Sequence, residues 1–525
     1  MSVRLSDRRY DSGQITVFLA LLFFLILGMG LLVFDGMREY MKAAFVEEAF
    51  DQAGEDILAD YDRSLFDRYH IFLMDPREEA YLPEDGKEAV SYNLSSGTFF
   101  AGVESDIKLD STKKALDDDG KTVLTQIKKW ETCQGVQKVP DLLKQLLDST
   151  EKKESVMEAL SDCEEEESSQ SSSDEDEDRS DGKSSDATSS QEEKKKETEE
   201  ERRVKSTWRE WKQVLSSILD SGILLYVLDD TDQVSDLTLS SRSSLPSQSS
   251  WKNRLSFQLD DISLTGLSQL KKLCSEGVTV DKSSSLLTSD TYLIPYIFEH
   301  YSHYKNVDKE KTHRLKYEIE YLLGGKAKDK ANLKYVADQL FLLRFIVNYG
   351  YAVNDAQIRL EAESMALILT GILGFPEGAE AVSMLLIASL CYGESLLEVR
   401  ALFAGEKVAL VKTQANWNLT FKNAAVKLKN HSDIIKVSKG VTYEEYLAGL
   451  LIIQSGSRRL LYRMMDIMQV NVTLDEPDFL MKNCITSYEW TGSFSWNPFY
   501  RRIIAFGINQ SQPYTIKLSR SVGYQ

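Results

Sequence analysis

A run of about twenty uncharged residues, from Ile15 to Phe34, most constrains what this chain can fold into. As an α-helix with a rise of about 1.5 Å per residue, the run is about 30 Å long, which is the thickness of a bilayer's hydrocarbon core. The run ends in Val33, Phe34 and Asp35 without the small-x-small pattern that precedes signal-peptide cleavage. The sequence therefore predicts a retained transmembrane helix, in preference to a signal peptide or a buried core helix.

The charges on the two sides of this run predict the orientation of the chain. Arg4, Arg8 and Arg9 precede the run, and the whole chain has a formal net charge of -20. By the positive-inside rule, residues 1–14 are expected in the cytoplasm, with the bulk of a single-pass cell-membrane protein on the extracytoplasmic side. The acidic balance also argues against binding to nucleic acid or docking on anionic lipid, because both need a basic surface.

Composition indicates a folded ectodomain that does not depend on disulfides. Hydrophobic residues make up 42% of the 525 residues, which is enough for a core. The five cysteines are far apart and include no Cys-x-x-Cys, so neither a zinc ribbon nor a thioredoxin-type site is predicted. They are Cys133, Cys163, Cys274, Cys391 and Cys484.

A helical pattern continues beyond the membrane run and predicts a stalk over residues 35–75. Apolar residues recur there at three- and four-residue steps, and no proline occurs before Pro76. Gly36 is the expected hinge where the helix leaves the membrane. The predicted stripe consists of Met37, Met41, Phe45, Ala49, Ala53, Ile57 and Tyr61.

The next parts of the chain differ sharply in composition. Residues 76–160 predict a mixed α/β part, with a strand over 97–109 and a helix over 122–133. Residues 161–203 are rich in Ser, Glu and Asp and offer almost nothing apolar, so a disordered insertion is expected. Residues 204–289 form a second mixed part, with a helix over 207–220 and a short strand over 222–228.

Helices dominate the remainder before a β-rich C-terminal part, residues 471–525. The helical core is predicted over residues 290–470, where the apolar run 381–393 is too short to span a bilayer and is expected to be a core helix. Two further helices are predicted from apolar stripes, and the fold class is α+β, mainly helical. The stripes are Leu333, Val336, Leu340, Leu343 and Ile346, and then Met365, Ile368 and Ile372.

Four residues invite a metal hypothesis. His300 and His303 are three residues apart and share a helix face, and a nearby carboxylate could add a ligand. The intervening tyrosines and the absence of His-Glu-x-x-His favour an ordinary aromatic face instead. The set is Glu299, His300, His303 and His313.

Two short motifs are better explained by structure than by chemistry. Glu318 and Glu320 are two residues apart, so on a helix they point in different directions and cannot serve one bond; polar positions between buried Tyr317, Ile319 and Tyr321 are expected. The run "GGKAKD", which begins at Gly324, lacks the first glycine and the Ser/Thr of a phosphate loop, so it is expected to end a helix where φ > 0 is needed.

Two groups of residues carry a resemblance to a known family. The first is "GQITVF" from Gly13 with the anchor, followed by "ADYDRSLFDRYHIFLMD" (59–75). The second comprises "YIFEHYSHY" (296–304), "LKYEIEYLLGGKAKDKANL" (315–333), "ESLLEVRALFAGEKVALVK" (394–412) and "YEEYLAGLL". Together they resemble an uncharacterised domain-of-unknown-function family encoded beside the tight-adherence (Tad) pilus genes of Gram-positive bacteria, with a TadE/TadG-like N-terminus.

This resemblance implies a place for the chain in a pilus system, without a reaction. A type IV-like prepilin is cleaved after a glycine and has a glutamate five residues later, which pairs with a neighbouring subunit. If cleavage fell between Gly13 and Gln14, that position would be Phe18. The missing carboxylate favours an uncleaved, TadG-like accessory subunit over a filament subunit.

The expected function is therefore a membrane-anchored accessory or pseudopilin-like structural protein of a Tad/type IV-like pilus, non-catalytic and without a cofactor. Expected partners are the membrane, other Tad pilus or pseudopilin subunits, and a second copy in a homo-oligomer, but no nucleic acid. Gly28 and Gly30 are the candidates for close helix packing in the membrane, against simple tolerance of glycine there. The alternative is a membrane-tethered extracytoplasmic metal-dependent hydrolase that acts on cell wall or peptides.

Overall fold

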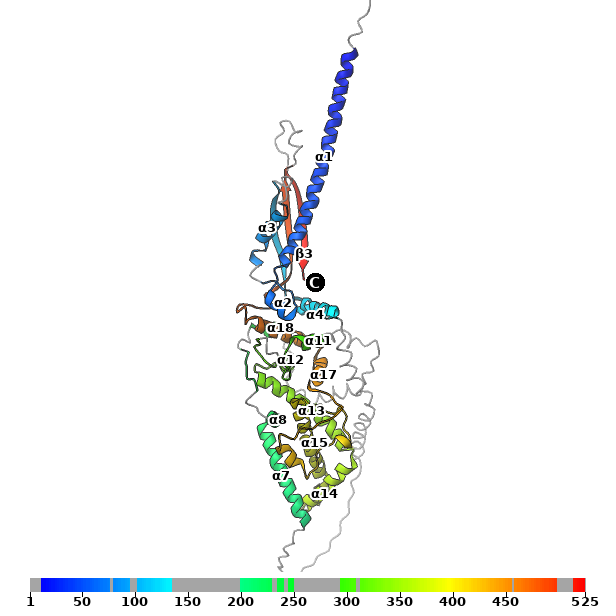
Figure 1. The fold of residues 1–525 in the computed structure, drawn as a ribbon, viewed down its shortest axis with the longest axis vertical. Coiled ribbons are helices and arrows are strands. Elements are labelled where there is room, and N and C mark those ends of the chain that lie inside the picture. The colour runs from blue at the N-terminus through cyan, green and yellow to red at the C-terminus, as the bar shows by residue number, and fades with distance from the viewer. Residues whose placement is uncertain are drawn as a thin grey trace, which may run out of the picture. The chain divides into compact units, whose positions relative to one another are not determined.

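The computed structural model describes residues 11–75, 79–94, 102–134, 199–228, 234–239, 244–249, 293–307, 312–455, 458–497 and 513–524. The chain divides into two compact units (Figure 1). Unit 1 joins the two ends of the chain, Met1–Gln126 and Asp475–Gln525, and unit 2 is Ile127–Leu474. Most of the predicted insertion lies outside the described residues; its last five residues belong to a helix that begins at Glu199.

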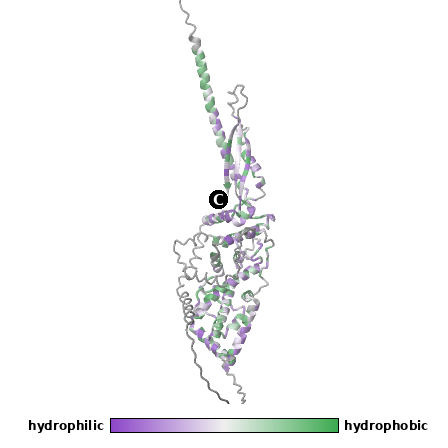
Figure 2. Cartoon of the chain, turned by 180° about the vertical axis from the view of Figure 1, so that it is seen from behind, coloured by the Kyte–Doolittle hydropathy of each residue, from purple (hydrophilic) through white to green (hydrophobic). Residues whose placement is uncertain are grey.

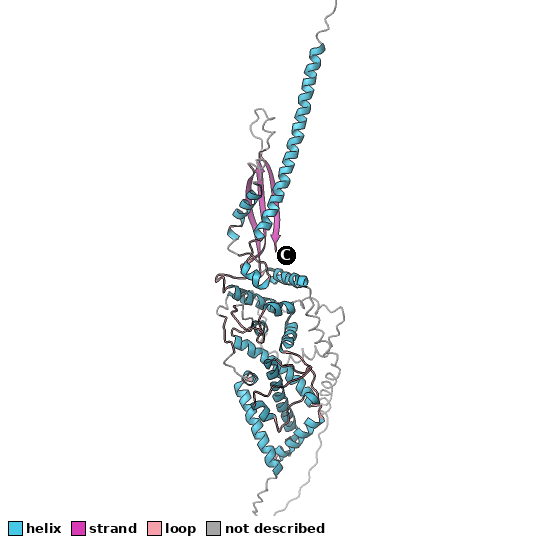
Figure 3. Cartoon of the chain, viewed as in Figure 1, coloured by secondary structure: helices cyan, strands magenta, loops and turns pink. Residues whose placement is uncertain are grey.

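Unit 1 combines a long N-terminal helix with a small antiparallel sheet. The sheet has the order β1-β2-β3, and its strands are drawn in magenta in Figure 3. The sequence predicted strands in both regions that supply it. The elements are α1 (Asp11–Leu58), α2 (Arg63–Tyr69), α3 (Leu82–Leu94), β1 (Glu104–Lys114), η3 (Asp117–Gly120), β2 (Ile485–Trp496) and β3 (Tyr514–Gly523), with α4 (Lys121–Gln134) crossing into unit 2.

The core of unit 1 lies between α1 and the central strand β2. Alternate residues of β2 are buried, as the two-residue period of a strand requires, and Trp490 and Phe494 are among them. Phe50 of α1 stacks on Trp490 with ring centroids 4.7 Å apart and meets Phe494 edge-on. The C-terminal strands thus bury the second half of the N-terminal helix.

The predicted stalk helix continues as far as Leu58. The apolar stripe predicted to be its buried face is wrong at Met37 and Met41, nearest the membrane run. Ala49 and Ala53 are buried, whereas Met37 and Met41 are 64% and 50% exposed. The sheet packs on the face that carries Val46, Ala49 and Ala53, and Met37 and Met41 point away from it. The helix also continues through Gly36, where a hinge was predicted.

Unit 2 is built from helices around α13, α14 and α15. The apolar segment predicted as a core helix is α15, and that prediction is confirmed, because two thirds of its apolar window is buried. The elements are α7 (Glu199–Ser221), α8 (Ile223–Val227), α9 (Pro246–Ser249), α11 (Leu293–His300), α12 (Glu318–Gly324), α13 (Asp329–Ala352), α14 (Ala356–Leu373), η7 (Pro376–Gly378), α15 (Ala379–Ala404), η8 (Gln414–Asn416), α16 (Ala424–Lys429), α17 (Tyr443–Ser455) and α18 (Arg458–Val472).

Two local predictions in unit 2 had opposite outcomes. The strand predicted over residues 222–228 is wrong: Gly222 has φ +83° and the residues after it form helix α8. A short apolar run has no period that separates a strand from a helix. The helix end predicted at the Gly-rich motif is confirmed, since Gly325 caps α12 in the left-handed region with φ +61°.

Candidate functional site

The first part of α1 exposes apolar side chains all round. Phe18 and Phe24 are 64% and 66% exposed, and the window that makes α1 a candidate membrane span has none of its residues buried. Figure 2 shows this end of the helix in hydrophobic green. A helix that is apolar on every side and packs on nothing within the described part of its own chain fits a lipid environment. Gly13 and Gln14, between which a prepilin-type cleavage would fall, lie in its first turn.

Gly28 and Gly30 are open positions on this helix. A Cβ atom at either residue would meet no other atom within 4 Å, leaving aside the helix's own nearby backbone. Among the described residues, no other element of the chain packs closely against these two glycines. The two residues are on different sides, because two steps along a helix turn it by about 200°.

Directly after its apolar part, α1 has polar side chains on the face that packs against the sheet. Asp35 is 5% exposed and Lys42 is 2% exposed, and Trp496 at the end of β2 donates its indole N–H to Glu39. Burial and the neighbouring Arg38 lower the pKa of Lys42, against the opposing effect of Glu39. Glu39 is five residues after Phe34, so this contact between α1 and β2 lies about 7.5 Å beyond the apolar run.

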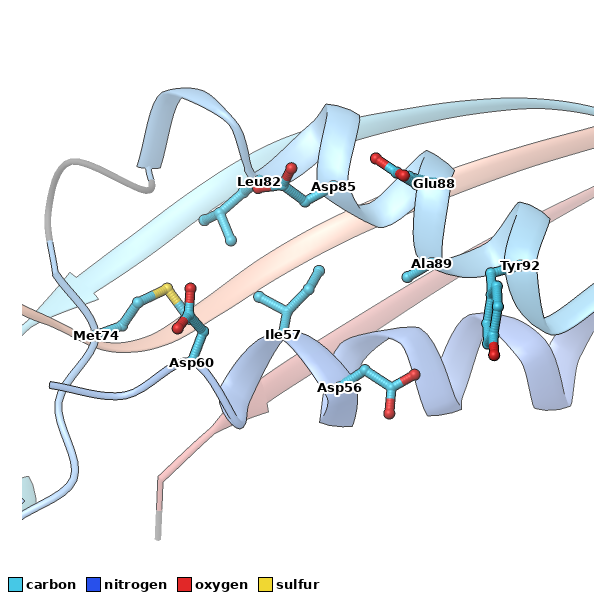
Figure 4. A pocket seen from close by; sticks show the side chains of 9 residues that line it. All are labelled: Asp56, Ile57, Asp60, Met74, Leu82, Asp85, Glu88, Ala89 and Tyr92. Carbon is cyan, nitrogen blue, oxygen red and sulfur yellow. The ribbon is translucent and has the colours of Figure 1, made fainter. Parts of the chain in front are cut away.

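A pocket of about 370 Å³ lies in unit 1 between the end of α1 and α3 (Figure 4). Its walls combine apolar side chains with four carboxylates. Burial raises the pKa of Asp85, and Glu88, Glu84 and Asp60 raise it further. Such a lining favours cationic groups over anionic ones. The residues are Asp56, Ile57, Asp60, Met74, Leu82, Asp85, Glu88, Ala89 and Tyr92.

The four residues of the metal hypothesis have different contacts in the structure. His300 stacks on Tyr296 with centroids 4.2 Å apart, and His303 lies against Phe298. His313 is held by Glu318, with Nδ1 2.9 Å from Oε1. Glu299 acts on a different group: burial raises the pKa of Glu131 to about 7, and Glu299 adds to the rise.

These four side chains are not arranged as the ligands of a metal ion. Across the described ranges, no group of three or more His, Cys, Asp or Glu residues could hold a metal ion. The metal hypothesis therefore stays a prediction, with no geometric support from its four residues.

Glu318, expected to be a polar position between buried neighbours, is itself fully buried. Its carboxylate accepts hydrogen bonds from the backbone N–H and hydroxyl of Ser302, at 2.8 and 3.1 Å, and from Asn471 at 2.6 Å. With His313, these contacts tie two segments of chain to the first turn of α12. The neighbours Tyr317, Ile319 and Tyr321 are buried as expected, and the burial of Glu318 itself is the addition that the structure makes.

Glu320 is also fully buried, and it points into a different set of contacts, as the helical spacing predicted. Its Oε1 accepts from the Tyr443 hydroxyl at 2.7 Å and from the Tyr304 N–H at 2.9 Å. Its Oε2 has no hydrogen-bond partner within the part of the chain that the structure describes. Burial raises the pKa of Glu320 to about 7, although the two hydrogen bonds act to lower it.

Two aspartates complete this buried acidic group around α12. Asp329 accepts from the N–H of Lys316 at 2.9 Å and from the Ser235 hydroxyl at 2.6 Å. Asp466 accepts from the Tyr321 hydroxyl at 2.8 Å and from the N–H of Ser247 at 2.9 Å. Each carboxylate therefore fixes a connecting segment, and burial raises the pKa of both.

A second buried network centres on two glutamates of α15. Glu398 receives a two-pronged contact from Arg344, at 2.8 and 2.9 Å. Lys412 bridges Glu398 and Glu394, with Nζ 2.7 and 2.6 Å from their carboxylates. Burial alone would raise the pKa of Glu398, but Arg344 and Lys412 lower it below its usual value. Two cations thus face two anions out of contact with water.

Arg400, two residues further along α15, binds backbone carbonyls. Its guanidinium donates to the carbonyls of Tyr226, Leu428 and Asn430 at 2.9 to 3.1 Å. It thereby fastens α8 and the end of α16 to the central helix. The charges of "ESLLEVR" inside an apolar helix were the available sequence signal for this network, because buried charges need partners.

One family model, described as "Family of unknown function (DUF5702)", matches residues 195–496, which is more than half of the chain. The chain belongs to this family. No curated protein and no solved structure matches it. The predicted resemblance to an uncharacterised family is confirmed at this level.

The DUF5702 match begins four residues before α7 and ends with β2. It includes both buried networks of unit 2 and leaves out α1. In the DUF5702 chain these networks hold helices and connecting segments together, and every carboxylate described above accepts hydrogen bonds from them. Apart from Oε2 of Glu320, the carboxylate oxygens of these networks have hydrogen-bond partners among the described residues. Such contacts suit a rigid scaffold, because they fix one arrangement of the elements that they join.

Proposed function

We propose that this DUF5702 protein is a membrane-anchored accessory, pseudopilin-like structural subunit of a Tad/type IV-like pilus system. The N-terminus is cytoplasmic and the head is extracytoplasmic. The observation that carries the proposal is the division of α1: one continuous helix of 48 residues offers an apolar, unpacked first part and buries its second part against a sheet.

That division supports a structural role in three ways. The apolar part is long enough to span a bilayer. The second part belongs to the core of unit 1, so forces on the anchor pass directly into a folded head. The N-terminal residues "GQITVF" are those that resemble the TadE/TadG-like proteins, and Phe18 at the sixth of them supports an accessory over a polymerising role.

The non-catalytic part of the proposal rests on the buried networks. Apart from Oε2 of Glu320, the carboxylate oxygens in these networks accept hydrogen bonds from backbone N–H, hydroxyl, amide or cationic groups, which supports a packing role. The one pocket described above is an acidic surface pocket in unit 1. Among the described residues, no observation favours the alternative of a metal-dependent hydrolase.

Filament counts would test the function. In the source bacterium, deletion of the gene is expected to abolish or strongly reduce surface filaments in electron micrographs, and the wild-type gene is expected to restore them. A matched control replaces residues 11–34 with a cleavable signal peptide, so that the same head is exported without its anchor. Unchanged filaments after deletion, or full rescue by the unanchored head, would overturn the proposal.

A further inference from the structure

Beyond the membrane run, α1 keeps an exposed apolar face that its own sheet leaves uncovered. Tyr40 is 77% exposed, Met37 64% and Met41 50%. With 3.6 residues per turn, Met37, Met41 and the exposed Ala44 lie on one side of the helix, opposite the sheet-facing Lys42 and Ala49. We call Met37, Tyr40, Met41 and Ala44 the outer face.

Lipid does not reach the lower half of the outer face. The headgroup layer adds about 5–8 Å on each side of the hydrocarbon core. If the core ends at Phe34, Met41 lies about 10 Å beyond it and Ala44 about 15 Å beyond it. Apolar side chains at that height stand in water unless protein covers them.

The outer face continues in both directions along the same line of the helix. Gly30 is seven residues before Met37, which is about two turns, so it lies on this line within the membrane. Glu48 and Glu55 are eleven and eighteen residues after Met37, about three and five turns, and both are exposed. The line therefore runs from a glycine through apolar residues to two carboxylates.

The two carboxylates restrict what can cover this line. A second copy rising from the same membrane would run parallel and place Glu48 against Glu48, which is repulsive. A different helix with basic residues at those heights would be attracted. Neighbouring Glu47 and Asp51 already show such pairing, with Arg520 at 2.6 and 2.7 Å.

We propose that the outer face docks a second, different membrane-anchored helix, which runs parallel to α1, packs apolar side chains on Met37 and Met41, and presents Lys or Arg to Glu48 and Glu55. This rests on the proposed function to the extent that the partner is expected to be another subunit of the same assembly. Gly30 lets the two helices approach closely inside the bilayer.

Site-specific photo-cross-linking in intact cells tests this surface. The full chain carries benzoylphenylalanine in place of Tyr40, and the matched control carries it in place of Tyr92 of α3, which is 79% exposed. The expected adduct joins position 40, and not position 92, to the juxtamembrane segment of another membrane protein, at a peptide that contains Lys or Arg. Adducts only to lipid, adducts to a second copy, or no adduct would overturn the proposal.

Reversing the charges of Glu48 and Glu55 tests whether the cross-link at position 40 depends on a specific contact or only on two proteins being close together in the membrane. The double variant Glu48→Lys/Glu55→Lys is expected to lower the adduct yield roughly tenfold, because two exposed attractions become repulsions. Reversal of the partner's basic residues to Glu is expected to restore the yield. An adduct yield that stays the same in both charge-reversed variants would contradict the proposed contact of basic partner residues with Glu48 and Glu55.

The same experiment distinguishes this inference from the proposed function. A specific, charge-dependent adduct to a membrane protein unrelated to pilus assembly would support the docking surface and refute the pilus role. A lipid adduct at position 40, together with lost filaments in the deletion strain, would refute the docking surface and leave the pilus role standing.

Discussion

Buried carboxylates are the most informative single residues of unit 2. The sequence showed that Glu318 and Glu320 point in different directions, because helical spacing fixes that relation. It did not show that both are buried, because their partners Asn471 and Tyr443 lie 153 and 123 residues away. Spacing along the chain reveals a helix face, but contacts between distant segments depend on the fold.

Glu320 makes a pH-dependent contribution to stability. Its pKa is about 7 in the folded chain against a usual value of 4.5, so between these values the unfolded chain has lost a proton that the folded chain keeps. Stability is then expected to fall as the pH rises from about 4.5 to 7, by about 3 kcal/mol in all.

Thermal unfolding of the detergent-solubilised chain at pH 5 and pH 8 measures this effect. Glu320→Gln keeps an acceptor for Tyr304 and Tyr443 and has no charge to bury, so the variant is expected to gain stability relative to wild type at pH 8 and to show little difference at pH 5. The same shift at both pH values would contradict a titrating Glu320.

Glu398 is expected to tolerate no neutral replacement, because it pairs with two buried cations. Glu398→Gln leaves Arg344 and Lys412 short of charge, and the expected loss of stability is about 3–5 kcal/mol. A matched surface pair is Lys436 with Glu406, where Lys436 is 74% exposed; Lys436→Met is expected to cost less than about 1 kcal/mol. Denaturant titration compares the two variants, and equal losses would show that burial does not set the cost.

Among the elements, the longer helices could be predicted from the spacing of their apolar residues. Short segments such as α8, and the buried face of α1, could not. The 3.6-residue pattern predicted α13, and alternation predicted the C-terminal strands. The spacing of apolar residues in α1 correctly predicted a helix, but it predicted the wrong buried face for the part beyond the membrane run. That face is set by β2 and β3, more than 400 residues later in the sequence, which no local pattern contains.

Packing of α3 on the sheet depends on Gly86. A Cβ atom there would collide with the ring of Trp490, whereas one at Gly36 of α1 would meet nothing within 4 Å. Gly86→Ala is expected to destabilise unit 1 by about 1–3 kcal/mol through overpacking. Gly36→Ala is expected to be neutral or slightly stabilising, because alanine is the better helix former. Thermal unfolding followed by tryptophan fluorescence compares them, and a harmless Gly86→Ala would contradict the close contact.

At the scale of the whole molecule, the sequence predicted the class of the fold and the presence of a long apolar N-terminal helix that is a candidate membrane span. It could not predict that the two chain ends build one unit, because that assembly depends on long-range strand pairing such as Ile107 with Gly492. The orientation of the chain in the membrane follows from charge and remains a prediction.

Cysteine labelling checks that orientation. Cys133 is exposed, whereas Cys391 and Cys484 are buried and burial raises the pKa of both thiols. In a variant with Cys163→Ser and Cys274→Ser, a membrane-impermeant maleimide is expected to label Cys133 in intact cells. Further replacement by Cys133→Ser is the control and should abolish labelling. Labelling of Cys133 only after the membrane is permeabilised would place the head in the cytoplasm.

The mass of the N-terminal peptide from purified membranes tests the central claim, that α1 is a permanent anchor of an accessory subunit. We expect a peptide that still contains residues before Gln14, because Phe18 stands where a polymerising prepilin has a glutamate. A mature chain that begins at Gln14 would contradict it, since the protein would then be processed as a pilin-like filament subunit.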